Sequence, residues 1–462
     1  MRKLYLGILA SMSSAFSPGS KPVHPTSQQQ QSTSSRAQIN TVHNREEFIE
    51  RISERLASID MTTLTRLPGS ESIPPNPKGG KRSSGSGGHC RASEPSRTNE
   101  PSRSREPVRS GGDVRTLIDK RVHNFKDVVK LLAVSLEYRK SGACGHTFRG
   151  ALNTLNTSSI IDRYSDLRGH IAIKVVAYPK KERYGSLYDA ARPENAELLI
   201  LHYLSVLVME NSTPHLILPI CTFYSNIRPF ISIHDQKIVE NKRYTAFVER
   251  FEKNDYYDNV SVLLSEWADR GDLLDYLRQN YKQMKESDWK VVVFQIISAL
   301  ASIHLRYPGF RHNDFKSNNI LVQSVDRKIS SFKYSINGKQ YRIPNIGVQI
   351  KLWDFDFACI PGLVENEKVD ADWTTMINIK PVQHQYYDIH YFFNTLRQKG
   401  FFPELFSAAE IPQAMKDFVL RTIPPEQVSD QVTKNCRILT DEEFTTPLRI
   451  IETDKWFREY RE

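Results

Sequence analysis

The chain has 462 residues, of which 39% are hydrophobic and 25% charged, enough for two or three domains and a sizeable core. Its formal net charge of +10 is concentrated in residues 1–112, which hold 16 Lys or Arg against 9 Asp or Glu. The five cysteines are far apart and form no CxxC pair, which indicates a reducing compartment and no zinc site. No run of 18 apolar residues occurs, so no membrane span is expected.

Residues 1–112 are predicted to form a disordered basic arm, because Ser, Pro, Gln, Arg and Gly dominate them and bury little apolar surface. Within the arm, Asn44 and Glu47 form a candidate capping box ahead of apolar residues at helical spacing, so a helix is expected at 44–59. The first 16 residues only weakly match a secretory signal, and we expect no export. A basic arm can contact nucleic acid, anionic lipid or acidic proteins, but a solvated arm is the favoured interpretation.

From about Asp113 onward the pattern indicates a folded region with strands first and helices later. After Gly271 the apolar residues recur at helical spacing, and the second helix should carry an apolar stripe on one face. This order predicts an α+β arrangement of two lobes. The strand candidates are residues 128–136 with the segment to 149, 168–178, 215–224 and 260–267, and the helix candidates start near Pro193 and cover 272–281 and 287–305.

The stretch RHNDFKSNN, from Arg311 to Asn319, follows the helix expected at 287–305 and leads into an apolar strand-like run. It places an acid, a lysine two residues later and an asparagine five residues later. Asp314 could accept or orient a hydroxyl proton, Lys316 could neutralise a moving phosphoryl group, and Asn319 could hold a magnesium ion. The spacing therefore suits phosphoryl transfer.

A second motif, IKLWDFD at residues 350–356, places a strand ahead of two acids. With residues 312–319, which match the pattern HRDxKxxN except that Asn313 replaces the Arg, and the run PVQHQYYDIHYFFNTL, it makes the chain from about 140 to 396 resemble eukaryotic-type Ser/Thr protein kinases. The divergent kinases of large DNA viruses, such as iridoviruses and ascoviruses, are the most similar in kind. The resemblance implies a two-lobed protein-kinase-like fold, with a β-rich N-lobe at 113–265, a helical C-lobe at 266–462, and ATP with Mg²⁺ or Mn²⁺ as cofactors.

The resemblance also implies the parts of a nucleotide site. Asp354 and Asn319 would hold the metal. Lys174, in the strand segment AIK, would contact the nucleotide phosphates and pair with a glutamate on the next helix, for which Glu197 is preferred over Glu194. Taken alone, Lys174 could equally be an exposed strand lysine, and either glutamate could be a first-turn acid beside the helix dipole.

The remaining nucleotide contacts are implied in the same way. Gly142 and Gly145 retain the second and third glycines of a GxGxxG loop, whose backbone amides would face the phosphates; a plain turn is the alternative. Backbone groups of Glu266 and Ala268 would bind adenine. Asp272 could contact ribose, cap the following helix, or do both.

Three positions depart from the kinase pattern or support it from a distance. Asn313 stands where the family commonly has an arginine that receives an activation-loop phosphate, so we expect activity without loop phosphorylation. Asp356 replaces the glycine of DFG, and we expect it to restrict the backbone there. Asp388 resembles the buried acid that braces the catalytic loop.

An inserted β-hairpin is expected near 328–346, because Asn337-Gly338 lies in the middle of a β-prone segment and suits a type I′ turn. It accounts for the unusual length between Asn319 and Asp354. Its role is not assigned.

The expected function is therefore ATP-dependent phosphorylation of Ser or Thr in protein substrates, by a viral enzyme in host cytoplasm and in the virion. The arm could bind virion or host proteins, with nucleic acid as a less favoured partner. Three alternatives stay open. The first is a small-molecule kinase of the aminoglycoside or choline type, which generally lacks a lysine equivalent to Lys316, and the second is a pseudokinase acting as a scaffold or virion protein. In the third, the arm is the functional part and binds nucleic acid, with the kinase fold as a passenger.

Overall fold

A six-stranded sheet and a mainly helical region make up the part of the chain that the computed structural model describes. The predicted arm (1–112), its expected helix and Gly142 lie outside the described residues. All described residues belong to one of the two units into which the chain divides. They are 119–122, 125–126, 129, 134–141, 145–152, 170–232, 242–428 and 432–462.

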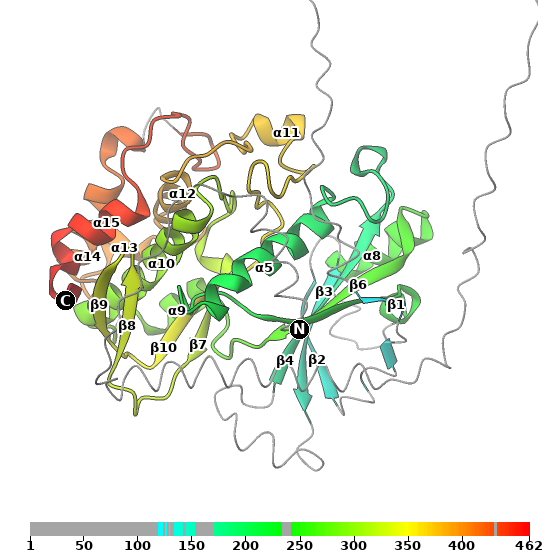
Figure 1. Cartoon of the computed structure of the whole chain (residues 1–462), viewed down its shortest axis with the longest axis horizontal. Coiled ribbons are helices and arrows are strands. Elements are labelled where there is room, and N and C mark those ends of the chain that lie inside the picture. Colours follow the sequence, from blue (N-terminus) through cyan, green and yellow to red (C-terminus); the bar gives the residue numbers. More distant parts are fainter. Residues whose placement is uncertain are drawn as a thin grey trace, which may run out of the picture. The chain divides into compact units, whose positions relative to one another are not determined.

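The sheet has the strand order β1-β5-β6-β4-β3-β2, and only β1 and β5 run parallel (Figure 1). Its central strand β4 carries the β-branched run predicted from the sequence, and most of its residues are buried. The strands are β1 (Asp119–Val122), β2 (Val134–Ser141), β3 (Gly145–Leu152), β4 (His170–Pro179), β5 (Pro219–Asn226) and β6 (Tyr256–Glu266).

Helix α5 (Pro193–Met209) packs against this sheet and against the helical region. Proline at its first turn and Glu194 near its start agree with the entry signals in the sequence. Smaller elements complete the N-terminal part, namely η5 (Glu182–Tyr184), α6 (Arg228–Ile231) and α8 (Lys242–Glu252).

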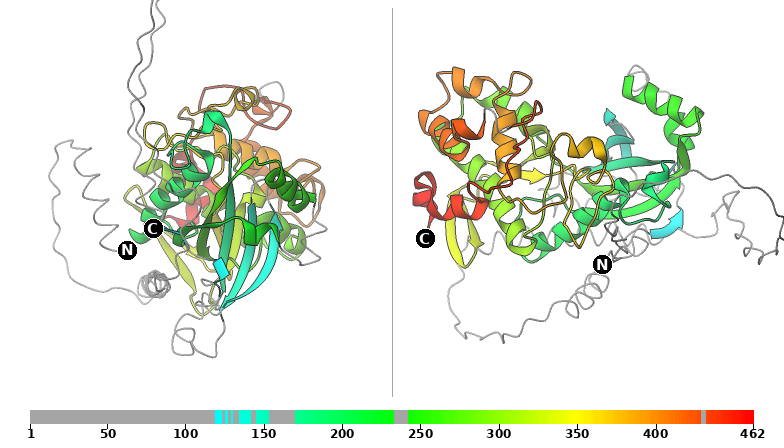
Figure 2. Two further views of the ribbon diagram at one scale, coloured as in Figure 1. Left: turned by 90° about the vertical axis from the view of Figure 1, so that its right-hand side faces the viewer. Right: turned by 90° about the horizontal axis from the view of Figure 1, so that it is seen from above.

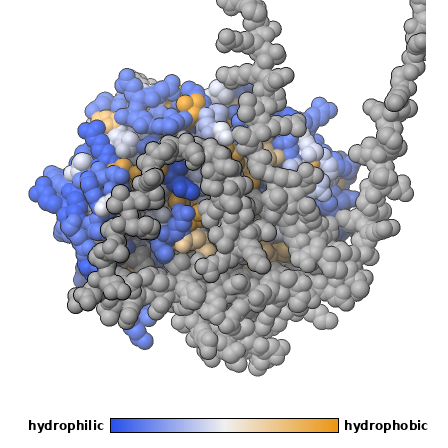
Figure 3. Space-filling model, in the orientation of Figure 1, coloured by the Kyte–Doolittle hydropathy of each residue, from blue (hydrophilic) through white to orange (hydrophobic). Residues whose placement is uncertain are grey.

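Helix α10 (Glu286–Arg306) forms the centre of the C-terminal part. Its residues 289–304 are all buried, those of the predicted apolar stripe among them, so the other faces of the helix are covered as well. By length and composition it could cross a membrane, but 89% of the relevant window is buried inside the protein, as in a core helix. On the face drawn in Figure 3, the surface that the described residues present is mainly hydrophilic.

In Figure 2 the elements coloured yellow to red lie together, apart from the six-stranded sheet, and several elements of this part contact α10 directly. The C-terminal part includes two helices beside the loop at 311–319, called the catalytic loop below, namely α9 (Leu273–Asn280) and α12 (Tyr387–Leu396). The remaining ones are η6 (Ser317–Asn319), α11 (Asp372–Thr375), α13 (Glu404–Ser407), α14 (Gln413–Thr422), η7 (Pro425–Gln427), α15 (Pro447–Thr453) and η8 (Lys455–Tyr460).

A β-hairpin of β8 (Ser331–Ile336) and β9 (Lys339–Pro344) lies where the sequence indicates an insertion. Asn337 and Gly338 both have positive φ, 50° and 74°, as a type I′ turn requires. Tyr334 and Tyr341 of the hairpin pack on Phe294 of α10, with ring centroids 5.5 and 5.7 Å away. The hairpin thus covers a face of α10 that lies outside the predicted apolar stripe.

A second pair of strands, β7 (Ile320–Ser324) and β10 (Val348–Leu352), carries the two motifs of the site at its ends. The segment after α5 is fixed to β10: the Leu352 amide donates to His215 O at 2.9 Å, and the His215 ring contacts Ile350 O and the Tyr334 hydroxyl. This contact ties the sheet-bearing part to the helical part beside the site. The predicted α+β, two-lobed fold is confirmed.

Candidate active site

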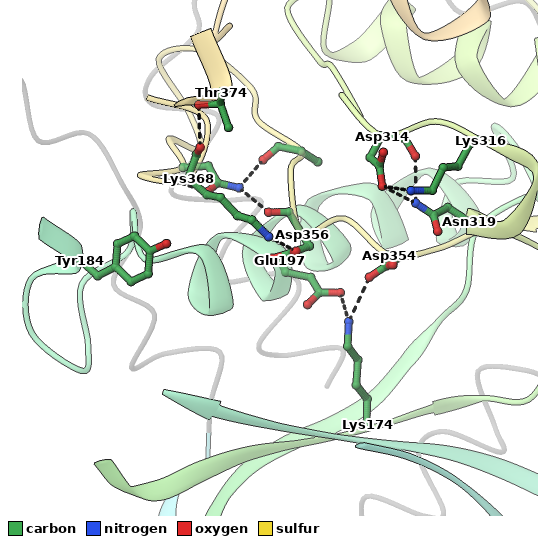
Figure 4. Close-up of polar contacts among 12 residues, drawn as sticks. Lys174, Tyr184, Glu197, Asp314, Lys316, Asn319, Asp354, Asp356, Lys368 and Thr374 are labelled. Atoms are coloured by element: carbon green, nitrogen blue, oxygen red, sulfur yellow. Dashed lines mark hydrogen bonds and ion pairs between the residues drawn. The ribbon is translucent and has the colours of Figure 1, made fainter. Parts of the chain in front are cut away.

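Three charged side chains from distant parts of the sequence meet between the sheet and the helical region (Figure 4). Lys174 Nζ on β4 lies 2.5 Å from Glu197 Oε1 on α5 and 3.4 Å from Asp354 Oδ1 after β10. Glu194, the rejected alternative, pairs instead with Arg192. The structure therefore brings together the lysine, the preferred glutamate and the candidate metal carboxylate.

The charge state of this cluster follows from its burial and its pairing. Burial alone would lower the pKa of Lys174, but Glu197 and Asp354 raise it well above its usual range. Burial opposes ionisation of Asp354, yet the nearby positive charges, Lys174 first, hold its pKa below the ordinary value. Lys174 is thus a fixed cation, and Asp354 is an anion available to a metal.

The catalytic loop positions its own three residues around one carboxylate. Lys316 Nζ donates to Asp314 Oδ2 at 2.7 Å, and Asn319 Nδ2 donates to the same oxygen and to Asp314 O, each at 2.9 Å. With its amide nitrogen turned to Asp314, the Asn319 side chain presents its oxygen to the opposite side. The loop thus combines an oriented acid, a cation and a metal-type oxygen ligand (Figure 4).

Asp388 on α12 fixes the backbone of this loop with both of its carboxylate oxygens. Its Oδ2 accepts a hydrogen bond from the His312 amide at 2.8 Å, and its Oδ1 accepts one from the Asn313 amide at 3.0 Å. Asn313 has φ 62°, a left-handed conformation that asparagine tolerates better than most residues. The carboxylate satisfies two buried donors that this bend removes from regular structure.

The left-handed residue of this motif is Asp354, two residues before Asp356. Asp354 has a positive φ of 66°, whereas Asp356 is not among the positive-φ residues of the described chain. The restriction expected from Asp356 in place of glycine stays a prediction. Asp356 instead forms an ion pair with Lys368, whose ammonium group also lies 3.9 Å from the Phe357 ring centroid.

A cavity of about 1120 Å³ opens beside Lys174, large enough for a nucleotide. Asn318, the neighbour of Asn319, lines the cavity, whereas Asp314 and Asn319 are not among its lining residues. The cavity is bounded by seven of the residues assigned from the sequence: Gly145, Lys174, Glu197, Glu266, Ala268, Asp272 and Asp354.

Local geometry explains three of these wall residues. A Cβ on Gly145 would lie 1.9 Å from Val175 O, so close strand packing requires glycine there. The Glu266 amide donates to Leu218 O and its carbonyl accepts from the Ser265 hydroxyl at 3.5 Å, so adenine binding by its backbone stays a prediction. Asp272 caps α9 by accepting from the Asp275 amide at 2.9 Å, so its capping role is present and its ribose contact stays a prediction.

Several residues of the site were missed in the sequence. Arg437 Nη2 lies 3.1 Å from Asp314 Oδ1, and the Tyr391 hydroxyl donates to the same oxygen at 3.3 Å. Arg311, buried against the Tyr387 ring, donates to Asn378 O and Val382 O. Arg437 has no local pattern that could reveal it, since it lies 123 residues after Asp314.

These features define a class: a two-lobed phosphotransferase with a paired lysine and glutamate, a catalytic loop and a metal carboxylate. Residues 235–445 match the family model described as poxvirus serine/threonine protein kinase. A protein of Acanthamoeba polyphaga mimivirus, named as a serine/threonine-protein kinase, is 46% identical over 360 residues, which are 75% of this chain and 74% of that protein.

More distant relatives carry the same description. A second mimivirus protein named as such a kinase is 24% identical over 210 residues, covering 38% of this chain and 53% of its own. A kinase relative from Invertebrate iridescent virus 6 is 38% identical over 64 residues, which are 14% of this chain and 12% of that protein. The chain belongs to the family of viral serine/threonine protein kinases, and the predicted viral kinase resemblance is confirmed.

Proposed function

We propose that the protein transfers the γ-phosphoryl group of ATP to Ser or Thr hydroxyls of protein substrates. The observation that carries this proposal is the convergence of Lys174, Glu197 and Asp354 on one wall of a nucleotide-sized cavity, beside the loop that holds Asp314. A small-molecule kinase is disfavoured because Lys316, which that class generally lacks, donates to Asp314. A pseudokinase is disfavoured because Lys174, Glu197, Asp314 and Asp354 are all present.

Each residue has a separate task in this reaction. Lys174, held by Glu197, would bind the nucleotide phosphates as a fixed cation. Asp314 would orient the acceptor hydroxyl and receive its proton, and Lys316 would stabilise the negative charge that develops on the transferred group. The backbone carbonyl of Glu266 and the backbone of Ala268 would bind adenine, and Asp272 the ribose.

The donor set at Asp354 and Asn319 fits magnesium. Both offer hard oxygen ligands, and Mg²⁺ is usually held by one or two protein groups together with substrate phosphates. Among the described residues no group of three or more His, Cys, Asp or Glu could hold a metal unaided. The metal would neutralise charge on the β- and γ-phosphates, and Mn²⁺ would serve the same ligands.

Mg-ATP binding is expected to stabilise the fold. At a concentration of one hundred times Kd, a ligand that binds only the native state adds about 2.7 kcal/mol to the unfolding free energy. Thermal denaturation with ATP should show this shift with Mg²⁺ or Mn²⁺ and a smaller one with EDTA. The D354N variant should lose the metal-dependent part; a shift in that variant equal to the wild type would contradict the metal assignment.

Activity is expected to survive phosphatase treatment. Residues 357–382, which follow the Asp354 motif and are called the activation segment here, are joined to the catalytic loop by neutral backbone acceptors. Arg311 donates to Asn378 O and Val382 O, and Asn313 Nδ2 donates to Phe357 O at 3.0 Å. No phosphate is needed for these contacts. Purified enzyme should therefore keep its kcat after dephosphorylation verified by mass spectrometry, and a large loss would refute this independence.

An acceptor screen tests the substrate class. Radiolabelled ATP should label casein or a basic protein on Ser and Thr, as mapped by mass spectrometry, in preference to small alcohols such as choline or an aminoglycoside. Labelling of the small alcohols alone would overturn the protein-kinase assignment. The cytoplasm and virion as places of action, and virion or host proteins as partners of the arm, form part of the same proposal.

A further inference from the structure

A tight turn at residues 432–438 brings Arg437 to the catalytic loop. Val432 and Ile438 form a β-bridge across its base. Within it, the Thr433 amide donates to Arg437 O at 2.7 Å, and the Cys436 amide donates to Thr433 O at 2.9 Å. Cys436 takes a left-handed φ of 65° to close the turn, a conformation that costs free energy in a non-glycine residue.

The turn is fixed from both sides. Asn394 on α12 donates to Cys436 O at 3.0 Å, and Asn378 of the activation segment donates to Ile438 O. Nearby, the His384 ring contacts Thr440 O at 3.1 Å. The position of Arg437 is therefore set by the same elements that surround the catalytic loop.

The Arg437 side chain is 7% exposed, and its guanidinium carbon lies 4.2 Å from the centroid of the Tyr391 ring. Its Nη2 donates to Asn313 O at 3.3 Å and to Asp314 Oδ1 at 3.1 Å. A buried ion pair with this geometry depends strongly on both partners, because either charge alone is costly to bury. The guanidinium thus contacts the backbone and the side chain of the catalytic loop at once.

Asp314 now has hydrogen-bond donors on both oxygens. A carboxylate offers about four acceptor positions. Lys316 and Asn319 take two on Oδ2, and Arg437 and Tyr391 take two on Oδ1. The 3.3 Å contact with Tyr391 is the longest of these bonds to the two carboxylate oxygens, so an acceptor hydroxyl would displace that one and leave Arg437 in place.

We propose that Arg437 is a positioning residue for phosphoryl transfer, fixing the rotamer of Asp314 so that Oδ1 faces the acceptor hydroxyl. Arg437 supplies, from the C-terminal segment, a positive charge beside the catalytic loop. The loop itself has the neutral Asn313 where kinases commonly have an arginine. This role rests on the proposed kinase function. It makes the C-terminal segment part of the active site.

The test compares Arg437 with a matched arginine remote from the loop. Arg421 also stacks on an aromatic ring, that of Phe418, and pairs with a carboxylate, Asp454, at 2.7 and 2.8 Å. In the full chain, R437Q should lower kcat for casein by about 100-fold, the scale of a misplaced reacting group, with the KM for ATP unchanged. R421Q should keep the wild-type kcat even where it lowers the melting temperature.

Two further variants separate positioning from folding. R437K should recover part of the kcat, and R437A should regain activity in low-millimolar guanidinium, which cannot restore an unfolded site. The positioning role of Arg437 would be overturned if R437Q kept the wild-type kcat or more, or lost no more than R421Q. It would also be overturned if neither R437K nor guanidinium-treated R437A recovered activity. An inactive wild-type chain would instead show that the proposed function has failed.

Discussion

D314N is expected to lower kcat by about 100- to 10,000-fold, the range that a positioned general base contributes. An amide cannot receive the proton of the acceptor hydroxyl, although its size matches that of the carboxylate. Mg-ATP should still bind, because Lys174 and Asp354 pair with each other and with Glu197, and Asn319 keeps its bond to the Asp314 backbone carbonyl. The measurement is steady-state phosphorylation of casein, with Mg-ATP binding followed by thermal shift.

Asp314 also holds four partners, so D314N will lose stability by about 1–3 kcal/mol through unsatisfied donors. D454N provides the control: Asp454 accepts two bonds from Arg421 and one from the Trp456 amide, far along the chain from the catalytic loop. It should lose stability but keep kcat. Residual activity in D314N near the wild-type level would remove Asp314 from the mechanism.

The residues that the sequence predicted best are those whose role depends on short spacing. Asp314, Lys316 and Asn319 lie within six residues of each other, and the η6 turn between a helix and a strand places them together. Asp354 directly follows a strand that pairs with the strand after Asn319, so register alone brings the two motifs to one end. Such local constraints survive without knowledge of the whole fold.

What the sequence could not give depends on contacts between distant segments. The pairing of Lys174 with Glu197 rather than Glu194 was a choice between two similar first-turn acids, and the orientation of α5 decides it. Arg437 reaches Asp314 only because residues 432–438 turn back between α12 and the activation segment. Neither placement leaves a periodic or compositional signal.

Backbone conformation also depends on three-dimensional context. The left-handed residue of the second motif is Asp354, whereas the sequence argument concerned Asp356. The cover over the face of α10 outside the predicted stripe comes from an insertion, β8 and β9, that spacing alone could not place. Neither feature changes the assigned residues.

K174M is expected to reduce kcat/KM by at least about 100-fold, the scale of one lost electrostatic contact to the reacting groups. It should also destabilise the fold by about 3 kcal/mol, because Glu197, whose side chain is 9% exposed, would be left as a buried charge without its cation. Both the loss of activity and the loss of stability follow from the loss of the Lys174–Glu197 ion pair. They can be separated because activity needs the Lys174 ammonium group, whereas the stability loss comes from the buried charge of Glu197.

The double variant K174M/E197Q makes the separation. Burial already raises the pKa of Glu197 beside Lys174, and loss of the lysine should raise it further. The folded state then binds a proton more tightly than the unfolded state, so the stability deficit of K174M should grow as pH rises above about 4.3, the ordinary glutamate value.

In K174M/E197Q this pH-dependent deficit should largely disappear while activity stays absent. Equal denaturation curves for K174M and the double variant across pH 5 to 8 would mean that the buried pair contributes little, and recovery of activity in the double variant would exclude Lys174 as the phosphate anchor.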